Sequence, residues 1–101
     1  MPKINVDVPH TLTAEDAKKR LEKKAEFLQG RYGDQVKDMT QTWAGNLLTF
    51  GFKTMGMRLD GTVSVEDNRV VVNGDLPFTA IMFKGKIESE IRQQLEHILR
   101  T

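Results

Sequence analysis

The stretch MRLDGTVSVEDNRVVVNGD, residues 57–75, decides the fold of this 101-residue chain. Apolar and polar residues alternate on both sides of the polar run 66–69, which is typical of two half-buried strands. A polar run this short is a tight turn that leaves no room for a crossover, so the two strands must pair antiparallel. The side chains expected on the buried face of this hairpin are Leu59, Val63, Val65, Val70 and Val72.

Three further segments extend the predicted sheet. Residues 3–8 alternate cleanly before Pro9, which cannot donate to a ladder and therefore ends the strand. Residues 47–55 alternate as well, and residues 36–43, which have the weakest strand pattern, precede them across a turn at 44–46. The side chains expected on the buried face of segments 3–8 and 47–55 are Ile4, Val6, Val8, Leu48, Phe50 and Phe52.

Two segments show helical periodicity. The first follows Thr13, whose hydroxyl can cap a helix, and it has Glu15 and Asp16 in its first turn, where the helix dipole favours acids. The second begins between Pro77 and Phe83. Apolar residues recur every three or four positions in both segments, as on the buried stripe of a surface helix. The predicted stripes are Ala14, Ala17, Leu21, Ala25 and Leu28 in the first helix, and Ala80, Phe83, Ile87, Ile91, Leu95 and Ile98 in the second.

The element order is therefore strand, helix, four strands, helix, in a chain that we expect to form a single domain over residues 1–101. One antiparallel five-stranded sheet with two helices packed on one face is the simplest way to bury both stripes. This α+β order, β-α-β-β-β-β-α, resembles the topology of TBP-like and helix-grip domains. A shared topology does not by itself give a function.

Composition argues against several classes of function. The formal net charge of +1 provides no basic excess for nucleic acid or an anionic membrane, so we expect neither partner. The chain has no cysteine, which excludes disulfides, thiolate catalysis and cysteine zinc sites and fits a reducing cytoplasm. We also expect no secretory signal and no transmembrane segment, because no apolar run approaches about 18 residues.

No constellation of catalytic or metal-binding residues is visible. His10 and His97 lack the clustered ligands that a metal requires. His10 is interpreted as a turn residue that contacts backbone, with a role as a general base as the alternative. Neither Ser64 nor Ser89 lies in a nucleophile motif. We therefore expect no enzymatic activity, no metal and no cofactor.

The segment FKGKIE, residues 83–88, places a glycine between two lysines and invites comparison with a phosphate loop. A Walker A loop needs a glycine five residues before Gly85 and a serine or threonine after the lysine, but Ala80 and Ile87 stand there. Glycine inside a helix costs about 1 kcal/mol relative to alanine. We therefore interpret Gly85 as a point of close backbone approach or a bend.

Two surfaces are candidates for binding. The outer face of an antiparallel sheet is commonly polar, so a group of apolar side chains there indicates an interface, unless a one-residue register shift turns some of them inward. The residues assigned to this face are Met39, Trp43, Leu47, Met55 and Val71.

The second candidate is a ligand pocket between the last helix and the sheet. Its predicted lining is Phe50, Phe52, Phe78, Phe83 and Ile87, with Met82 beside the opening. Because these side chains are bulky and the chain is short, we expect the gap to be filled.

Three short motifs resemble those of a known family over nearly the whole chain. They are Pro9-His10, Trp43-Ala44-Gly45-Asn46 before Leu48-Thr49-Phe50, and Phe83-Lys84-Gly85-Lys86-Ile87-Glu88 after Leu76-Pro77. With these motifs the chain resembles the polyhydroxyalkanoic acid system family, small bacterial proteins associated with polyhydroxyalkanoate granule gene regions. The resemblance implies a cytoplasmic protein linked to storage-granule metabolism, and it supplies no catalytic residues.

Together with the missing catalytic constellation, the resemblance favours a non-catalytic interaction protein. Such a protein would form a homodimer or dock on a granule surface or a granule protein. The alternative is a small carrier of an apolar, acyl- or lipid-like ligand in the helix–sheet pocket.

Overall fold

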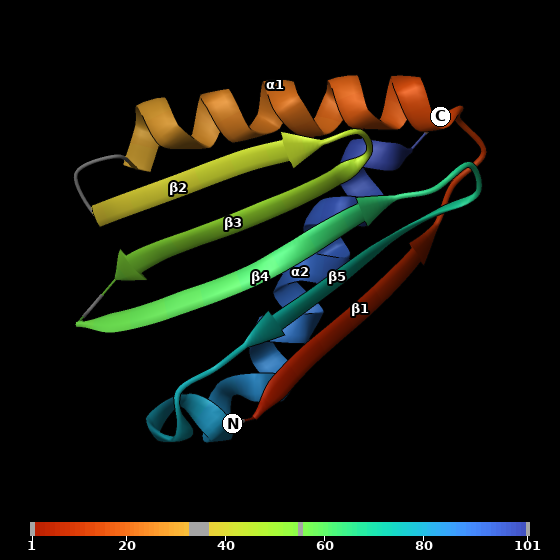
Figure 1. Ribbon diagram of the computed structural model, residues 1–101. Coiled ribbons are helices and arrows are strands. Elements are labelled where there is room, and N and C mark those ends of the chain that lie inside the picture. Colours follow the sequence, from red (N-terminus) through yellow and green to blue (C-terminus); the bar gives the residue numbers. More distant parts are fainter. Residues whose placement is uncertain (1, 33–36, 55, 101) are drawn as a thin grey trace.

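A computed structural model of the chain describes residues 2–32, 37–54 and 56–100 (Figure 1). The elements, in chain order, are β1 (Lys3–Pro9), α1 (Ala14–Tyr32), β2 (Lys37–Ala44), β3 (Leu47–Thr54), β4 (Met57–Val65), β5 (Arg69–Asp75), the short 3₁₀ helix η1 (Phe78–Phe83) and α2 (Lys84–Leu99). The predicted α+β order is confirmed, with η1 as an addition that the sequence did not predict.

The five strands form one open sheet in the order β1-β5-β4-β3-β2, and every neighbouring pair is antiparallel. Strands β2 to β5 follow one another as a meander, and β1 joins the free side of β5. The register aligns one row of side chains across the whole sheet. From β1 to β2 this row is Val6, Val72, Val63, Leu48 and Trp43.

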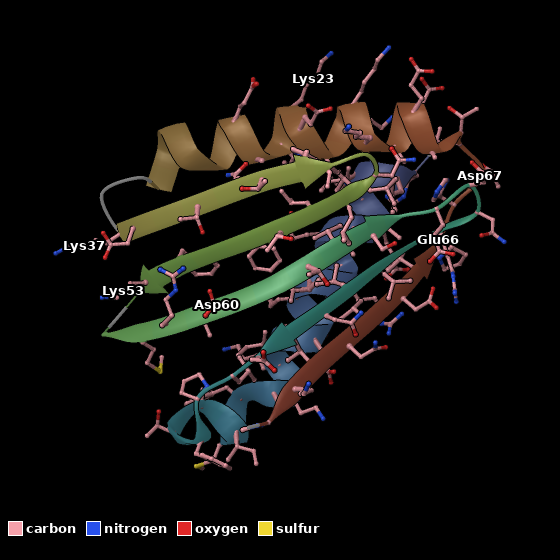
Figure 2. The ribbon with its side chains drawn as sticks, in the orientation of Figure 1. Lys23, Lys37, Lys53, Asp60, Glu66 and Asp67 are labelled. Carbon is pink, nitrogen blue, oxygen red and sulfur yellow. The ribbon has the colours of Figure 1, made fainter. Side chains whose placement is uncertain are left out.

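The two faces of the sheet divide as the alternation predicts. On the inner face, the predicted β1 and β5 residues Ile4, Val6, Val8, Val70 and Val72 are all buried. The outer face carries charged side chains such as Lys53, Asp60 and Glu66 (Figure 2). This division is the expected one for an antiparallel sheet with helices on one side only.

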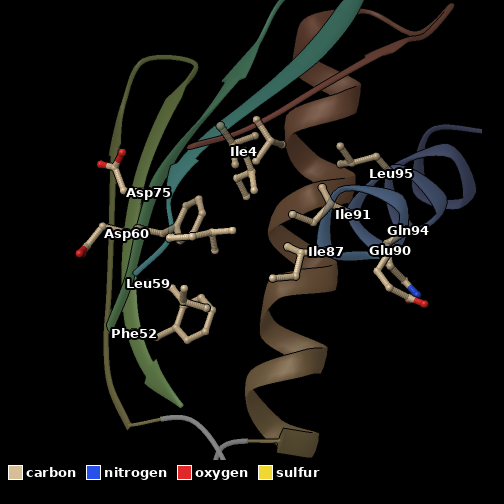
Figure 3. A pocket seen from close by; sticks show the side chains of 14 residues that line it. Ile4, Phe52, Leu59, Asp60, Asp75, Ile87, Glu90, Ile91, Gln94 and Leu95 are labelled. Atoms are coloured by element: carbon tan, nitrogen blue, oxygen red, sulfur yellow. The ribbon is translucent and has the colours of Figure 1, made fainter. Parts of the chain in front are cut away.

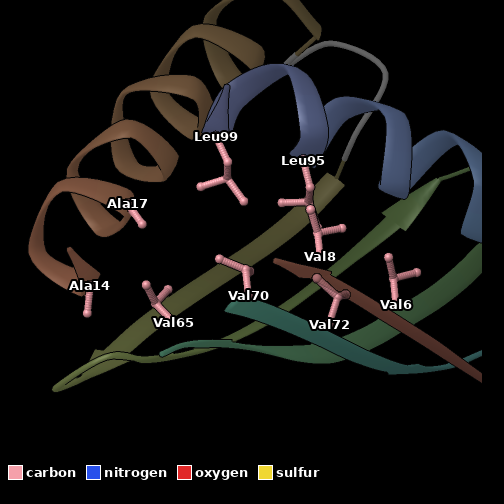
Figure 4. Close-up of a cluster of buried hydrophobic side chains, with 9 residues drawn as sticks. All are labelled: Val6, Val8, Ala14, Ala17, Val65, Val70, Val72, Leu95 and Leu99. Atoms are coloured by element: carbon pink, nitrogen blue, oxygen red, sulfur yellow. The ribbon is translucent and has the colours of Figure 1, made fainter. Parts of the chain in front are cut away.

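Both helices lie over the inner face. Figure 4 shows Ala14 and Ala17 of α1, and Leu95 and Leu99 of α2, above valines of β1, β4 and β5. Thr13 caps α1 as predicted, because its hydroxyl accepts a hydrogen bond of 3.1 Å from the Asp16 amide. These contacts bury the inner face of β1 and β5, together with Val65 at the end of β4.

The two helices are also joined at the carboxyl end of α2. The Arg20 guanidinium of α1 donates to the carbonyl oxygens of Ile98 and Arg100, at 3.1 Å and 2.8 Å. The last carbonyls of a helix have no partners within the helix and carry partial negative charge. A cation from α1 therefore satisfies carbonyl groups at the end of α2 and links the two helices.

His10 is a turn residue, as predicted. Its Nδ1 accepts from the Leu12 amide at 3.1 Å, so the proton lies on Nε2, which donates to the Glu66 carbonyl at 2.9 Å. The His10 amide donates to the Asn68 carbonyl at 3.0 Å. The histidine thus ties the end of β1 to the turn between β4 and β5, and both ring nitrogens are engaged.

The predicted buried stripe of the last helix was wrong at its start. Phe83 was expected to be buried, but it is 54% exposed, and Leu99 is buried at the other end. The reason is that residues 78–83 form a 3₁₀ helix, which has three residues per turn instead of 3.6. The spacing of the α-helical stripe therefore cannot be extended back through this segment.

The interpretation of Gly85 as a point of close approach was also wrong. A Cβ atom at this position would meet nothing within 4 Å. Because α2 begins at Lys84, Gly85 lies in the first helical turn on an exposed surface and not in the helix interior. No packing contact there requires a glycine.

Candidate apolar binding site

An apolar cleft of about 420 Å³ lies between the sheet and α2. It forms because the helices bury the inner face of β1 and β5, while the inner-face side chains of β3 and of most of β4 remain only half-buried. Figure 3 shows side chains of the two walls facing each other across this space. The walls include Phe50 and Phe52 of β3, Leu59 and Val63 of β4, and Ile87 and Ile91 of α2.

The β3 part of the cleft wall is aromatic, and its packing depends on a glycine in the neighbouring strand. Phe50 pairs with Gly61, and a Cβ at Gly61 would lie 2.8 Å from the Phe50 ring and 2.5 Å from the Asn73 carbonyl oxygen. The Phe50 ring therefore lies directly over Gly61. The Phe50 and Phe52 rings are stacked, with centroids 6.3 Å apart and an interplanar angle of 19°.

The few polar residues around the cleft keep their charges out of it. The carboxylates of Asp60 and Asp75 point away from α2 in Figure 3. Asp60 pairs with Arg58 at 3.1 Å, and Asp75 pairs with Lys3 at 3.8 Å. Glu90 and Gln94 are exposed residues of α2 at the rim. The interior of the cleft is therefore formed by hydrocarbon.

A second apolar feature lies at η1. Four large side chains of this single segment are exposed, and we call them the η1 tip: Phe78 (70% exposed), Ile81 (52%), Met82 (88%) and Phe83 (54%). Ala80, at the centre of the segment, is buried and anchors it to the fold. Two exposed lysines, Lys84 and Lys86, follow the tip in the chain.

The η1 tip and the cleft adjoin each other. Ala80 packs in one cluster with Ile4 and Leu76, and Leu59 and Ile87 of the cleft wall pack against the same cluster. A short buried layer therefore separates an exposed apolar tip from an open apolar cleft.

The structure brings together three of the five side chains predicted to line a pocket. Phe50, Phe52 and Ile87 lie in the cleft wall. Phe78 and Phe83 belong instead to the η1 tip. The expectation that bulky side chains would fill the gap was wrong, because α2 packs mainly against β1 and leaves the inner face of β3 uncovered.

The five residues assigned to the outer face do not share one face. Trp43 pairs with Leu48 and lies on the inner side, where it packs against the core. Lys18 of α1 holds it there, with its ammonium 4.8 Å from the ring centroid and 2.8 Å from the Gly45 carbonyl oxygen. The error was one of turn length: the connection has two residues, Gly45 and Asn46, where the prediction used three.

The remaining members of that set are also divided. Met39 lies on the same side of the sheet as Gln41, which pairs with the inward Phe50, and the Gln41 amide nitrogen is 3.1 Å from the Met39 sulfur. Met55 lies outside the described residues. Leu47 and Val71 are on the outer face, with Ser64 between them in the register.

Charges border this part of the outer face. Arg69 pairs with Asp7 at 2.8 Å and with Glu66 at 3.3 Å. The Glu66 carboxylate, followed by Asp7, raises the pKa of Arg69 above its usual value. Leu47 and Val71 therefore lie on a largely polar surface.

The sequence contains a signal for the exposure of the η1 tip, although the prediction assigns Ala80 and Phe83 to the buried stripe of the last helix. The run FTAIMF has five apolar residues in six positions, more than one face of a helix can bury.

Among the described residues, no helix is long and apolar enough to cross a membrane, and no group of three or more His, Asp and Glu side chains could hold a metal ion.

The comparison with protein families gives one match, over residues 4–99, to the family described as "Putative polyhydroxyalkanoic acid system protein". No curated protein and no solved structure matches the chain. The match covers all the strands and helices except the first residue of β1, including both the cleft and the η1 tip. The chain therefore belongs to the polyhydroxyalkanoic acid system family.

Proposed function

We propose that this protein is a non-catalytic binding protein that docks on the surface of polyhydroxyalkanoate granules through the η1 tip. One observation carries the proposal: four large apolar side chains within six residues are exposed, and Met82 is 88% exposed. Contiguous apolar side chains on a protein surface commonly mark an interaction site. Membership of the polyhydroxyalkanoic acid system family supports an apolar polymer as the surface that receives them.

The tip is built to project its side chains outward. Ala80 and the preceding Leu76 are buried, so the backbone of the segment is anchored while the larger side chains face solvent. Full burial of a Met or Phe side chain is worth roughly 1.5–3 kcal/mol. Phe78 and Met82 together would therefore contribute roughly 3 kcal/mol on entering an apolar surface, after scaling for their exposed fractions.

The lysines that follow the tip suit the same role. Lys84 and Lys86 are exposed at the start of α2. Long lysine side chains can lie along an apolar surface and keep their ammonium groups in water. Apolar side chains beside lysines are typical of segments that bind at the boundary between water and an apolar phase.

Cosedimentation with poly(3-hydroxybutyrate) granules tests the proposal. The double variant Phe78→Ser, Met82→Ser should lose about a hundredfold in affinity, which is the energy above expressed as an equilibrium constant. The matched control is Leu47→Ser, the same kind of change at an exposed leucine at the start of β3, where it pairs with Ser64 near the end of β4. Unchanged binding of the double variant would refute the role of the tip, and loss with Leu47→Ser would assign docking to the outer face.

Self-association is the competing use of the same surface. Sedimentation velocity over a dilution series distinguishes the two, because a homodimer dissociates on dilution and a granule-binding monomer does not change. A wild-type dimer that the double variant abolishes, without granule binding by either protein, would make the tip a subunit interface.

A further inference from the structure

We infer that the cleft between the sheet and α2 binds a single uncharged aliphatic chain and discriminates against fatty-acid anions. This site is separate from the η1 tip and would accept one chain, whereas the tip would meet an extended surface. The inference therefore goes beyond granule docking and does not depend on it.

The size and lining of the cleft fit a small apolar ligand. Its volume of about 420 Å³ falls within the range of roughly 300–1,000 Å³ that is typical of small-molecule sites. Aromatic side chains from β3 form one wall and aliphatic side chains from α2 form the other. A hydrocarbon chain in this space would cover side chains that are now only half-buried.

The described residues that line the cleft provide no positive charge for a carboxylate. The charged residues that line it, among those the structure describes, are Asp60, Asp75 and Glu90, and all three are acidic. The first two direct their carboxylates away from the space, and Glu90 at the rim would repel an anion. A buried carboxylate without a cation or hydrogen-bond donors is strongly unfavourable.

An ester has no such penalty. It carries no charge, so it needs no cation in the apolar interior of the cleft. A polyhydroxyalkanoate chain consists of aliphatic units joined by esters, so a segment of it is an occupant of the class that this lining selects.

The test compares one acyl chain as an uncharged methyl ester and as a carboxylate anion. Methyl 3-hydroxyoctanoate and the 3-hydroxyoctanoate anion are titrated at pH 7 into the wild-type chain, with backbone amide chemical shifts as the readout. We expect the ester to bind at least tenfold more tightly, with shifts on β3, β4 and α2. Equal or tighter binding of the anion, or shifts confined to other elements, would overturn the inference.

A charge reversal at the rim tests the electrostatic part separately. Glu90 is exposed, so Glu90→Lys should fold normally. It should improve binding of the anion several-fold and leave the ester unchanged, because only the anion interacts with the new charge. An equal effect on both ligands would contradict the discrimination by charge.

Two variants of one wall residue test the location. Phe52→Asp places a charge in the cleft, and Phe52→Trp narrows it while remaining apolar, so the second variant decides the question if the first fails to fold. The first should abolish binding of the ester, and the second should change its affinity. The control Phe78→Asp alters the η1 tip and should retain ester binding while weakening granule binding. An ester affinity that neither variant of Phe52 changes would remove the cleft as the site, whatever the outcome for the tip.

Discussion

Replacing Gly61 with alanine should destabilise the fold and displace Phe50 in the wall of the cleft. The added methyl group would lie 2.8 Å from the Phe50 ring and 2.5 Å from the Asn73 carbonyl oxygen. The ring can move, but the carbonyl belongs to β5, which pairs with β4 along this register. The strands themselves must therefore shift to accept the methyl group.

The magnitude follows from overpacking. Extra atoms in a well-packed region cost about 1–3 kcal/mol. With a urea dependence of about 1–3 kcal/mol per molar for a small domain, the unfolding midpoint should fall by about 1 M. Displacement of Phe50 toward α2 would also narrow the cleft, so the Gly61→Ala variant should bind the methyl ester more weakly than the wild type.

Gly85→Ala is the matched control, because it adds the same methyl group where nothing lies within 4 Å. It should raise the free energy of unfolding by about 0.5–1 kcal/mol, since alanine restricts the unfolded chain and favours the helix. Urea titrations of both variants give the comparison. A Gly61→Ala variant as stable as the wild type would refute the packing of Phe50 on Gly61.

Three further substitutions test the placement of side chains. Lys18→Ala should lower the free energy of unfolding by about 1–2 kcal/mol, because it removes the cation–π contact to Trp43 and the hydrogen bond to Gly45. It should also make the Trp43 ring more accessible to iodide, so that its fluorescence is quenched more strongly. Unaltered quenching would contradict the contact between Lys18 and Trp43. Leu95→Ala should cost about 2–5 kcal/mol and Met82→Ala less than about 0.5 kcal/mol in urea unfolding, since only the first is buried. Similar losses in both would show that Met82 is packed.

The fold was predictable where local pattern and global packing agree. The alternation in residues 57–75 assigned the inward valines correctly, because a strand alternates faces at every residue. The same rule failed for Trp43. Its face depends on whether the turn before β3 has two or three residues, and a change of one residue reverses every side chain beyond it.

The binding features were less predictable because they depend on how elements cross. Periodicity identified the inward side chains of β3 and α2, but no local pattern states that α2 packs on β1 and leaves Phe50 and Phe52 uncovered. One signal was present. Gly61 occupies an inward position between Leu59 and Val63, so the inner face lacks a side chain there.

The exposure of the η1 tip could not be predicted from helical periodicity either. The segment 78–83 continues into α2, and its apolar residues match helical spacing closely enough to suggest a buried stripe. Because the geometry changes from 3₁₀ to α-helical at Lys84, the segment buries Ala80 but leaves its large apolar side chains exposed.

The most direct test of docking uses the absence of cysteine from the chain. Met82→Cys gives a single site for an environment-sensitive dye on the η1 tip, and Leu47→Cys gives the matched site at the start of β3, beside Ser64 near the end of β4. On addition of poly(3-hydroxybutyrate) granules, we predict a blue shift and protection from iodide for the dye at position 82 and no change at position 47. A dye at position 82 that remains as exposed as in free solution, while the protein cosediments with granules, would contradict docking through the η1 tip.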